Sequence, residues 1–192
     1  MTNRRNGATG ALCAACLLFS AGALRPVPAS GQVLLTQDEA LRLAFPGFVE
    51  VERRTAFLGE VERARVADLA GSKASGALVT YYVGRTPDGP VGVAYFDVHR
   101  VRTLPEVLMV VVTPTGRIDR IEILRFAEPR EYMAPAGWLE LFEDHGLVGD
   151  LANKNTVAWI TGATLTSRAV TDAVRRVLAV HEILDPLGDG TQ

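Results

Sequence analysis

Strand-like segments separated by short turns occupy the middle of the sequence, and they restrict the fold more than any other feature. They are residues 77–83, 91–98, 107–112 and 118–126. Thr86-Pro87-Asp88-Gly89 forms a turn between the first two segments, and Pro114-Thr115-Gly116 forms one between the last two. Proline presets the bend of such a turn, and glycine permits a positive φ. Because short turns join neighbouring antiparallel strands, the segments predict an antiparallel sheet.

One long amphipathic segment, residues 166–184, dominates the C-terminal third. Its apolar residues recur at the spacing of one helical face, and they are Val170, Ala173, Val174, Val177, Leu178 and Ile183. Strands followed by a helix that can pack on them are typical of an α+β fold, with an antiparallel sheet packed against helices. The length of 192 residues and the hydrophobic content of 48% suit a single domain.

Shorter helices are predicted over residues 37–44, 60–70 and 136–143. Thr36 can cap the first of them. The second is expected to pack through Val61, Ala64 and Leu69, which lie on one side of a helix. Residues 48–57 mix charge with valine and could form a further strand.

The charge balance argues against nucleic-acid binding. The chain has 20 Lys and Arg against 22 Asp and Glu, which gives a formal net charge of −2. Binding to nucleic acid needs Lys and Arg clustered on one face. The short runs Arg53-Arg54 and Arg175-Arg176 are instead expected to be solvent-exposed, and no nucleic-acid partner is predicted.

Residues 1–31 have the order of a secretory signal peptide. Two arginines give a basic start, residues 11–24 are apolar, and Ala29-Ser30-Gly31 are small enough for a peptidase. The apolar run is shorter than the roughly 20 residues that span a bilayer. We expect cleavage near Gly31, a periplasmic or otherwise extracytoplasmic location, and a domain over residues 32–192.

Two other interpretations of the N-terminus stay open. One is an uncleaved membrane anchor, and the other is a lipoprotein attached through Cys16. The lipoprotein is less favoured because Leu17-Leu18-Phe19 continue the apolar run beyond the cysteine. Cys13 and Cys16 have C-x-x-C spacing, but both lie in a segment that would be removed or sit in lipid. No thiol chemistry is therefore expected.

The segment Thr161-Gly162-Ala163-Thr164-Leu165-Thr166-Ser167 lies directly before the long predicted helix, where a phosphate can bind. The first N–H groups of a helix lack partners within it, and the helix dipole adds positive charge. Gly162 and Ala163 let the backbone approach a ligand, and Thr164, Thr166 and Ser167 offer hydroxyl groups. A threonine before a helix is also a common N-cap, so a capped turn or a plain anion site stays open.

The same segment resembles the flavinylation motif, [ST]-G-A-T, of FMN-binding domains. These domains occur in the C subunit of sodium-pumping NADH:quinone oxidoreductase, in the G subunit of Rnf-type complexes and in small exported FMN-binding proteins. The resemblance extends over residues 116–184, where Glu128-Pro129 after strand 121–126 is similar to a Glu-(x)-Pro segment of the family. The family usually has an acid three residues before the motif, and this chain has Ala158 there.

This resemblance implies an exported flavoprotein in which Thr164 carries FMN through a phosphoester bond. An FMN transferase that uses FAD would attach the flavin outside the cytoplasm. The neighbouring site residues would be Thr161, Gly162, Ala163, Leu165, Thr166 and Ser167. The implied role is electron transfer between a membrane redox complex and another electron-transfer protein, rather than a stand-alone reductase. The alternative is a flavin-free extracytoplasmic binding module that uses the helix N-terminus at Thr164 as an anion site.

Aromatic residues near the motif could cover a flavin ring. Those near it in sequence are Trp159, Trp138, Tyr132 and Phe126. Trp159 is the best candidate because it lies nearest to Thr164, although each of them also suits a core position. His99, His145 and His181 show no metal-ligand spacing, and His181 is expected to be solvent-exposed. No metal is predicted.

Overall fold

The computed structural model describes residues 32–47, 49–74, 76–151 and 157–188. The predicted signal peptide, residues 1–31, lies outside this part of the chain, and so do Cys13 and Cys16. None of the helices within the described ranges is both long and apolar enough to cross a bilayer.

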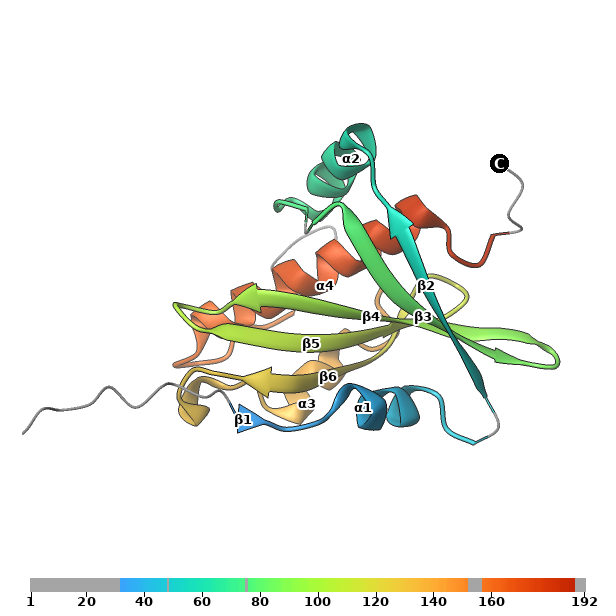
Figure 1. The fold of residues 1–192 in the computed structure, drawn as a ribbon. Coiled ribbons are helices and arrows are strands. Elements are labelled where there is room, and N and C mark those ends of the chain that lie inside the picture. The colour runs from blue at the N-terminus through green and yellow to red at the C-terminus, as the bar shows by residue number, and fades with distance from the viewer. Residues whose placement is uncertain (1–31, 48, 75, 152–156, 189–192) are drawn as a thin grey trace, which may run out of the picture.

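The described residues form one antiparallel sheet of six strands in the order β1-β6-β5-β4-β3-β2 (Figure 1). The strands are β1 (Gln32–Val33), β2 (Glu50–Phe57), β3 (Leu78–Thr86), β4 (Gly89–Arg100), β5 (Pro105–Val112) and β6 (Ile118–Phe126). Strands β2 to β6 follow one another across the sheet, and the short β1 pairs with β6 at the far edge. The antiparallel sheet predicted from the turns is confirmed, and β2 and β1 extend it at its two edges.

The helices are α1 (Gln37–Ala44), α2 (Glu60–Ala70), α3 (Ala136–Leu139) and α4 (Thr164–Leu184), and two 3-10 helices are η1 (Arg130–Tyr132) and η2 (Glu140–Phe142). Thr36 caps α1 through a reciprocal capping box with Glu39. Gly71 ends α2 in the left-handed conformation, with a φ of 61°. The helix predicted over 136–143 is shorter than expected, because its second half tightens into η2.

Two apolar cores lie on opposite faces of the sheet. The larger core lies between the sheet and α4, which crosses behind β4 and β5 in the view of Figure 1. Its fully buried members include Val83, Val93, Leu108, Val110, Val112, Val170, Ala173 and Val174. Burying each valine or leucine contributes about 1.5–3 kcal/mol. The smaller core lies against α1, where the ring of Phe45 fills the space that a side chain at Gly84 would occupy.

The predicted packed side of α2 was wrong for two of its three residues, while the third, Leu69, is half-buried and packs against the larger core. Val61 is 75% exposed and Ala64 is also exposed, whereas Val66 and Ala70 are buried. The reason is tertiary, because α2 packs against α4 rather than over the sheet (Figure 1). The contact with α4 therefore buries the side of α2 on which Val66 and Ala70 lie.

Arg175 and Arg176 were predicted to be solvent-exposed, and this was also wrong. Arg175 is 5% exposed and donates to the main-chain oxygens of Leu69 and Ala70 at the end of α2. Carbonyl groups at a helix C-terminus carry partial negative charge, so a buried guanidinium is stabilised there. Arg176 donates to both carboxylate oxygens of Asp97, at 2.7 and 3.1 Å.

His181 is a third correction. It was expected to be solvent-exposed, but its Nδ1 lies 3.0 Å from the hydroxyl of buried Tyr95, and the two rings meet edge to face. Burial lowers the pKa of His181 to about 4, against a smaller opposite effect of Asp185. The imidazole is therefore neutral at physiological pH.

Candidate functional site

The N-terminus of α4 forms the centre of the candidate site. Gly162, with a φ of 83°, turns the chain into the helix, and Ala163 is the flanking residue. Within the described residues no side chain caps α4, and its first turn holds no acidic residue. The N–H groups of this turn and the helix dipole are therefore not balanced by a local negative charge.

The four hydroxyl groups of the segment have different roles. Thr166 is fully buried, and its hydroxyl donates to the main-chain oxygen of Tyr132 at 2.5 Å. Ser167 is buried too, and its hydroxyl donates to the oxygen of Ala163 while accepting from the N–H of Ile160. Thr161 and Thr164 are exposed. Thr166 and Ser167 thus fix the turn, and Thr164 offers its hydroxyl to solvent.

A cavity of about 220 Å³ opens beside this turn. It is lined by Arg102, Tyr132, Gly162, Ala163, Thr164, Leu165 and Thr166. The structure therefore brings together five of the predicted site residues, and it leaves Thr161, Ser167 and Trp159 outside the lining. Thr164 differs from the other hydroxyl residues of the segment because it is both exposed and part of the cavity wall.

Arg102 reaches the cavity from the loop between β4 and β5, far from the motif in sequence. The central carbon of its guanidinium lies 5.4 Å from the ring centroid of Tyr132. This distance is typical of a cation–π contact. The side chain thus places a positive charge at the cavity wall, close to the first turn of α4.

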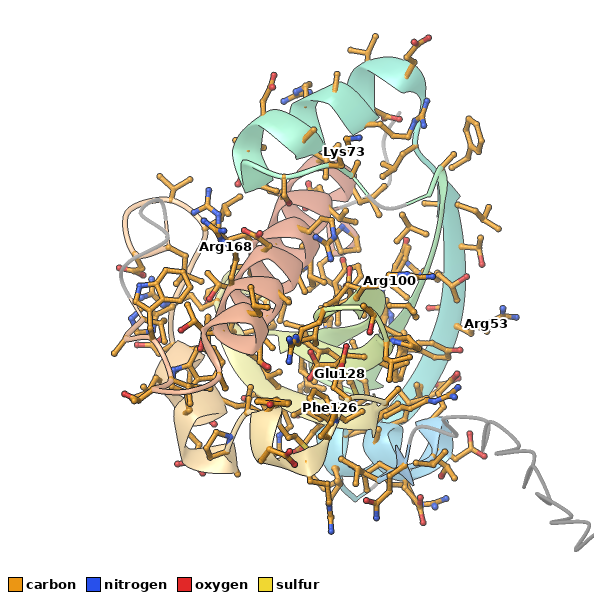
Figure 2. The ribbon with its side chains drawn as sticks, turned by 90° about the vertical axis from the view of Figure 1, so that its left-hand side faces the viewer. Arg53, Lys73, Arg100, Phe126, Glu128 and Arg168 are labelled. Carbon is orange, nitrogen blue, oxygen red and sulfur yellow. The ribbon has the colours of Figure 1, made fainter. Side chains whose placement is uncertain are left out.

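Glu128 holds the loop that carries Arg102. Its carboxylate accepts the main-chain N–H groups of Thr103 at 2.8 Å and of Leu104 at 2.9 Å. These hydrogen bonds stabilise the charged carboxylate and lower the pKa of Glu128. Figure 2 looks onto this end of the molecule, where Glu128 and Arg100 lie over the sheet and Arg168 lies on the other side of α4.

The aromatic candidates divide into core and surface residues. Phe126 is buried in the larger core, and Trp138 is buried with its indole N–H donating to the oxygen of Ala158 at 2.6 Å. Trp159 is 40% exposed and stands outside the cavity lining. Among the described residues, Tyr132 is the aromatic residue that lines the cavity. It adds aromatic surface to a wall that it shares with Arg102.

A buried charged cluster lies in the strands that lead into the Arg102 loop. His99 on β4 is held between two carboxylates, with Nδ1 at 3.0 Å from Asp97 and Nε2 at 2.9 Å from Glu106 on β5. Burial lowers the pKa of His99, but the hydrogen bonds and charges of both acids outweigh this and raise it above its usual value. For Asp97 the effects have the opposite direction. Burial alone would raise its pKa, but the contacts with His99 and Arg176 outweigh burial and lower the pKa below its usual value.

The sequence predicts the turn before α4, but it does not predict the residues from other elements that surround this turn. Arg102, the loop contacts of Glu128 and the carbonyl of Tyr132 all reach the site from other elements. The Glu128-Pro129 pair was noted, but its spacing does not reveal which backbone the carboxylate binds. No group of three metal-ligating side chains occurs within the described ranges.

The geometry suits a ligand with an anionic group and a flat apolar part. The helix N-terminus and Arg102 favour a phosphate, Tyr132 and Leu165 offer apolar surface, and the Thr164 hydroxyl is within the same cavity. These residues fit the phosphate end of FMN.

No curated protein matches the chain. The family model described as FMN-binding domain matches residues 105–179, a range that includes β5, β6 and all but the end of α4. Thr164 and the whole turn before α4 lie inside the match. Residues 105–179 are therefore similar to FMN-binding domains, and this similarity supports flavin binding by the protein.

Proposed function

We propose that the protein is an exported flavoprotein that carries FMN covalently, through a phosphoester bond to Thr164, and transfers electrons. The observation that carries the proposal is the position of Thr164. It is the exposed hydroxyl residue of the motif that also lines the cavity beside Arg102 and Tyr132. The hydroxyls of Thr166 and Ser167 are buried and bonded to the main chain, which leaves them unsuited to attachment.

Attachment needs a transferase and FAD, as the family resemblance implies. The Thr164 oxygen forms a bond to the phosphorus of the FMN half of FAD, and the pyrophosphate bond breaks. AMP leaves, and the hydroxyl proton passes to solvent or to the leaving phosphate. The first turn of α4 and Arg102 stabilise the negative charge of the resulting diester.

Electron transfer is favoured over a substrate reaction for a chemical reason. FMN supplies the redox chemistry once it is bound, and the protein holds it in place. Among the residues that the structure describes, those that line the cavity include no carboxylate and no imidazole, the groups that most often act as acid or base toward a substrate. The expected partners are an FMN transferase and a membrane redox complex or another electron-transfer protein.

Export is proposed from the sequence of residues 1–31. Its basic start, short apolar run and small residues are those of a signal peptide. N-terminal sequencing of the protein from its host should give a first residue between about Ala29 and Gly31. An intact Met1 on a protein recovered from the cytoplasm would contradict export.

The attachment is tested by peptide mass mapping after co-expression with an active FMN transferase. Wild type should carry the mass of FMN on Thr164, Thr164→Ala should carry none, and Thr164→Ser should retain a part. Thr115→Ala is the matched control, because Thr115 is exposed in the turn between β5 and β6 and lies outside both the motif and the cavity lining, and this variant should be labelled as wild type is. Flavin on Thr161 or Thr166 would show that another threonine is the acceptor.

Two outcomes separate the proposal from its alternative. If no residue is labelled while a control protein is, Ala158→Asp tests whether a missing acid prevents recognition by the transferase. Labelling of Ala158→Asp would support Thr164 as the flavin site and would show that the transferase needs an acid at position 158. If it also stays unlabelled and no FMN binds, the flavin-free anion-binding module is the better description.

A further inference from the structure

Arg102 is tied to the candidate site by contacts that join four segments, namely the end of β6, the β4–β5 loop, η1 and the first turn of α4. Glu128, after β6, fixes the main chain of Thr103 and Leu104 in the β4–β5 loop. The guanidinium of Arg102 then lies over the ring of Tyr132, and the oxygen of Tyr132 accepts the hydroxyl of Thr166 in the first turn of α4. The position of the charge relative to Thr164 is therefore built into the fold.

The contact with Tyr132 also leaves the hydrogen-bond donors of Arg102 accessible. A cation–π contact is made with the ring and uses no oxygen or nitrogen acceptor, so the five N–H donors of a guanidinium can still bind an anion. Within the described residues, no side-chain hydrogen bond or ion pair engages these donors of Arg102. A planar cation with accessible N–H groups at the wall of a cavity is suited to bind a phosphate through two parallel hydrogen bonds.

We propose that Arg102 is the residue that recognises the phosphate of FMN, both before attachment and in the diester on Thr164. This inference rests on the proposed function and deepens it by assigning a specific role to a residue outside the matched segment, 105–179. The helix N-terminus offers a partial positive charge and N–H donors, and Arg102 adds a full charge on the same cavity.

Arg168 provides an internal comparison. Like Arg102, it is exposed. It lies one helical turn after Thr164 on α4, but it does not line the cavity. Figure 2 places it on the side of α4 away from Glu128. Long-range attraction of an anion would involve both arginines, whereas direct contact with the phosphate involves Arg102 alone.

The experiment compares FMN with riboflavin, which has the same ring system and no phosphate. Thr164→Ala serves as the parent, so that binding is measured without attachment, and Arg102→Gln and Arg168→Gln are added to it. Flavin fluorescence titrations of the full chain give the Kd for each ligand. We expect Arg102→Gln to weaken FMN binding about tenfold and to leave riboflavin binding unchanged. Arg168→Gln should change neither, and the salt dependence of FMN binding should be smaller in Arg102→Gln.

Other results would overturn the inference. Equal FMN affinity in Arg102→Gln and the parent would show that Arg102 does not contact the phosphate. Equal losses for FMN and riboflavin would assign Arg102 to the ring or to the loop, and an equal loss in Arg168→Gln would indicate general attraction. If the parent binds too weakly to titrate, the rate of flavin attachment with Thr164 intact decides, and Arg102→Gln should be about tenfold slower. Absence of flavin from wild type would instead refute the proposed function itself.

Discussion

Glu106 and His99 face each other across the β4–β5 ladder, with 2.9 Å between Oε2 of Glu106 and Nε2 of His99. Glu106 is fully buried, and Asp97 lies on the other side of the same imidazole. A buried carboxylate is costly unless an opposite charge compensates it. The contacts with both acids raise the pKa of His99 and so favour the protonated imidazole, which supplies a compensating charge.

The stability of the protein is therefore expected to fall on the alkaline side. Because the pKa of His99 is higher in the folded state than its usual value of 6.5, its contribution is full below pH 6.5 and is lost as the pH rises through the folded-state pKa. His99→Gln should lower the free energy of unfolding by about 3 kcal/mol at pH 6 and remove this pH dependence. Urea unfolding between pH 6 and 9 measures both.

His145→Gln is the matched control for this series. His145 is in a loop and bonds through Nδ1 to the main-chain oxygen of Glu143, so its replacement should leave the alkaline dependence as in wild type. A His99→Gln protein with the wild-type dependence would show that another group titrates there.

His181 is expected to give the opposite pH dependence, a loss of stability on the acid side. Its pKa is lowered to about 4, chiefly by burial beside Tyr95, so the folded state holds the imidazole neutral. Below pH 6.5 the unfolded chain takes up this proton and the folded protein does not, so stability falls as the pH drops toward 4. The full loss is on the order of 3 kcal/mol at 1.36 kcal/mol per pKa unit. An NMR titration that places the His181 pKa near 6.5 would contradict this.

The parts of the fold that sequence predicts best are those with a local cause. The cap at Thr36, the stop at Gly71 and the turn at Pro87-Asp88-Gly89 each act within a few residues, and the elements beside them begin or end close to where expected. The packed side of α2 and the burial of Arg175 depend on where α4 lies. No local pattern contains that information.

In the candidate site, too, the sequence predicts the features with a local cause and not those that depend on distant elements. A glycine-containing turn before a long amphipathic segment predicts a helix N-terminus with exposed N–H groups. It does not predict which hydroxyls are used internally, because the bond from Thr166 ends on the main chain of Tyr132. Nor does it predict Arg102, whose place depends on β-ladder register and on Glu128.

Glu128→Ala tests whether the loop contacts position Arg102. Loss of the carboxylate frees the N–H groups of Thr103 and Leu104 and loosens the loop, so FMN binding should weaken several-fold while riboflavin binding changes little. Adding Arg102→Gln to Glu128→Ala should cause little further loss, because both variants act through one contact. Glu131→Ala is the control, since Glu131 is a nearby exposed acid in η1. Additive losses in the double variant would indicate that Glu128 affects binding independently of Arg102.

Thr166→Val tests the bond that joins the first turn of α4 to Tyr132. Valine keeps the shape of the side chain but removes the hydroxyl, so the Tyr132 oxygen loses its partner in a buried position. An unsatisfied buried group costs about 1–3 kcal/mol, and urea unfolding should show a loss in that range. Because Thr164 keeps its own hydroxyl, flavin should still attach there, more slowly. Thr166→Ser should restore the rate and the stability that the hydrogen bond supplies, apart from about 0.8 kcal/mol for the lost buried methyl group. Wild-type stability and attachment in Thr166→Val would show that this hydrogen bond does not hold the turn in place.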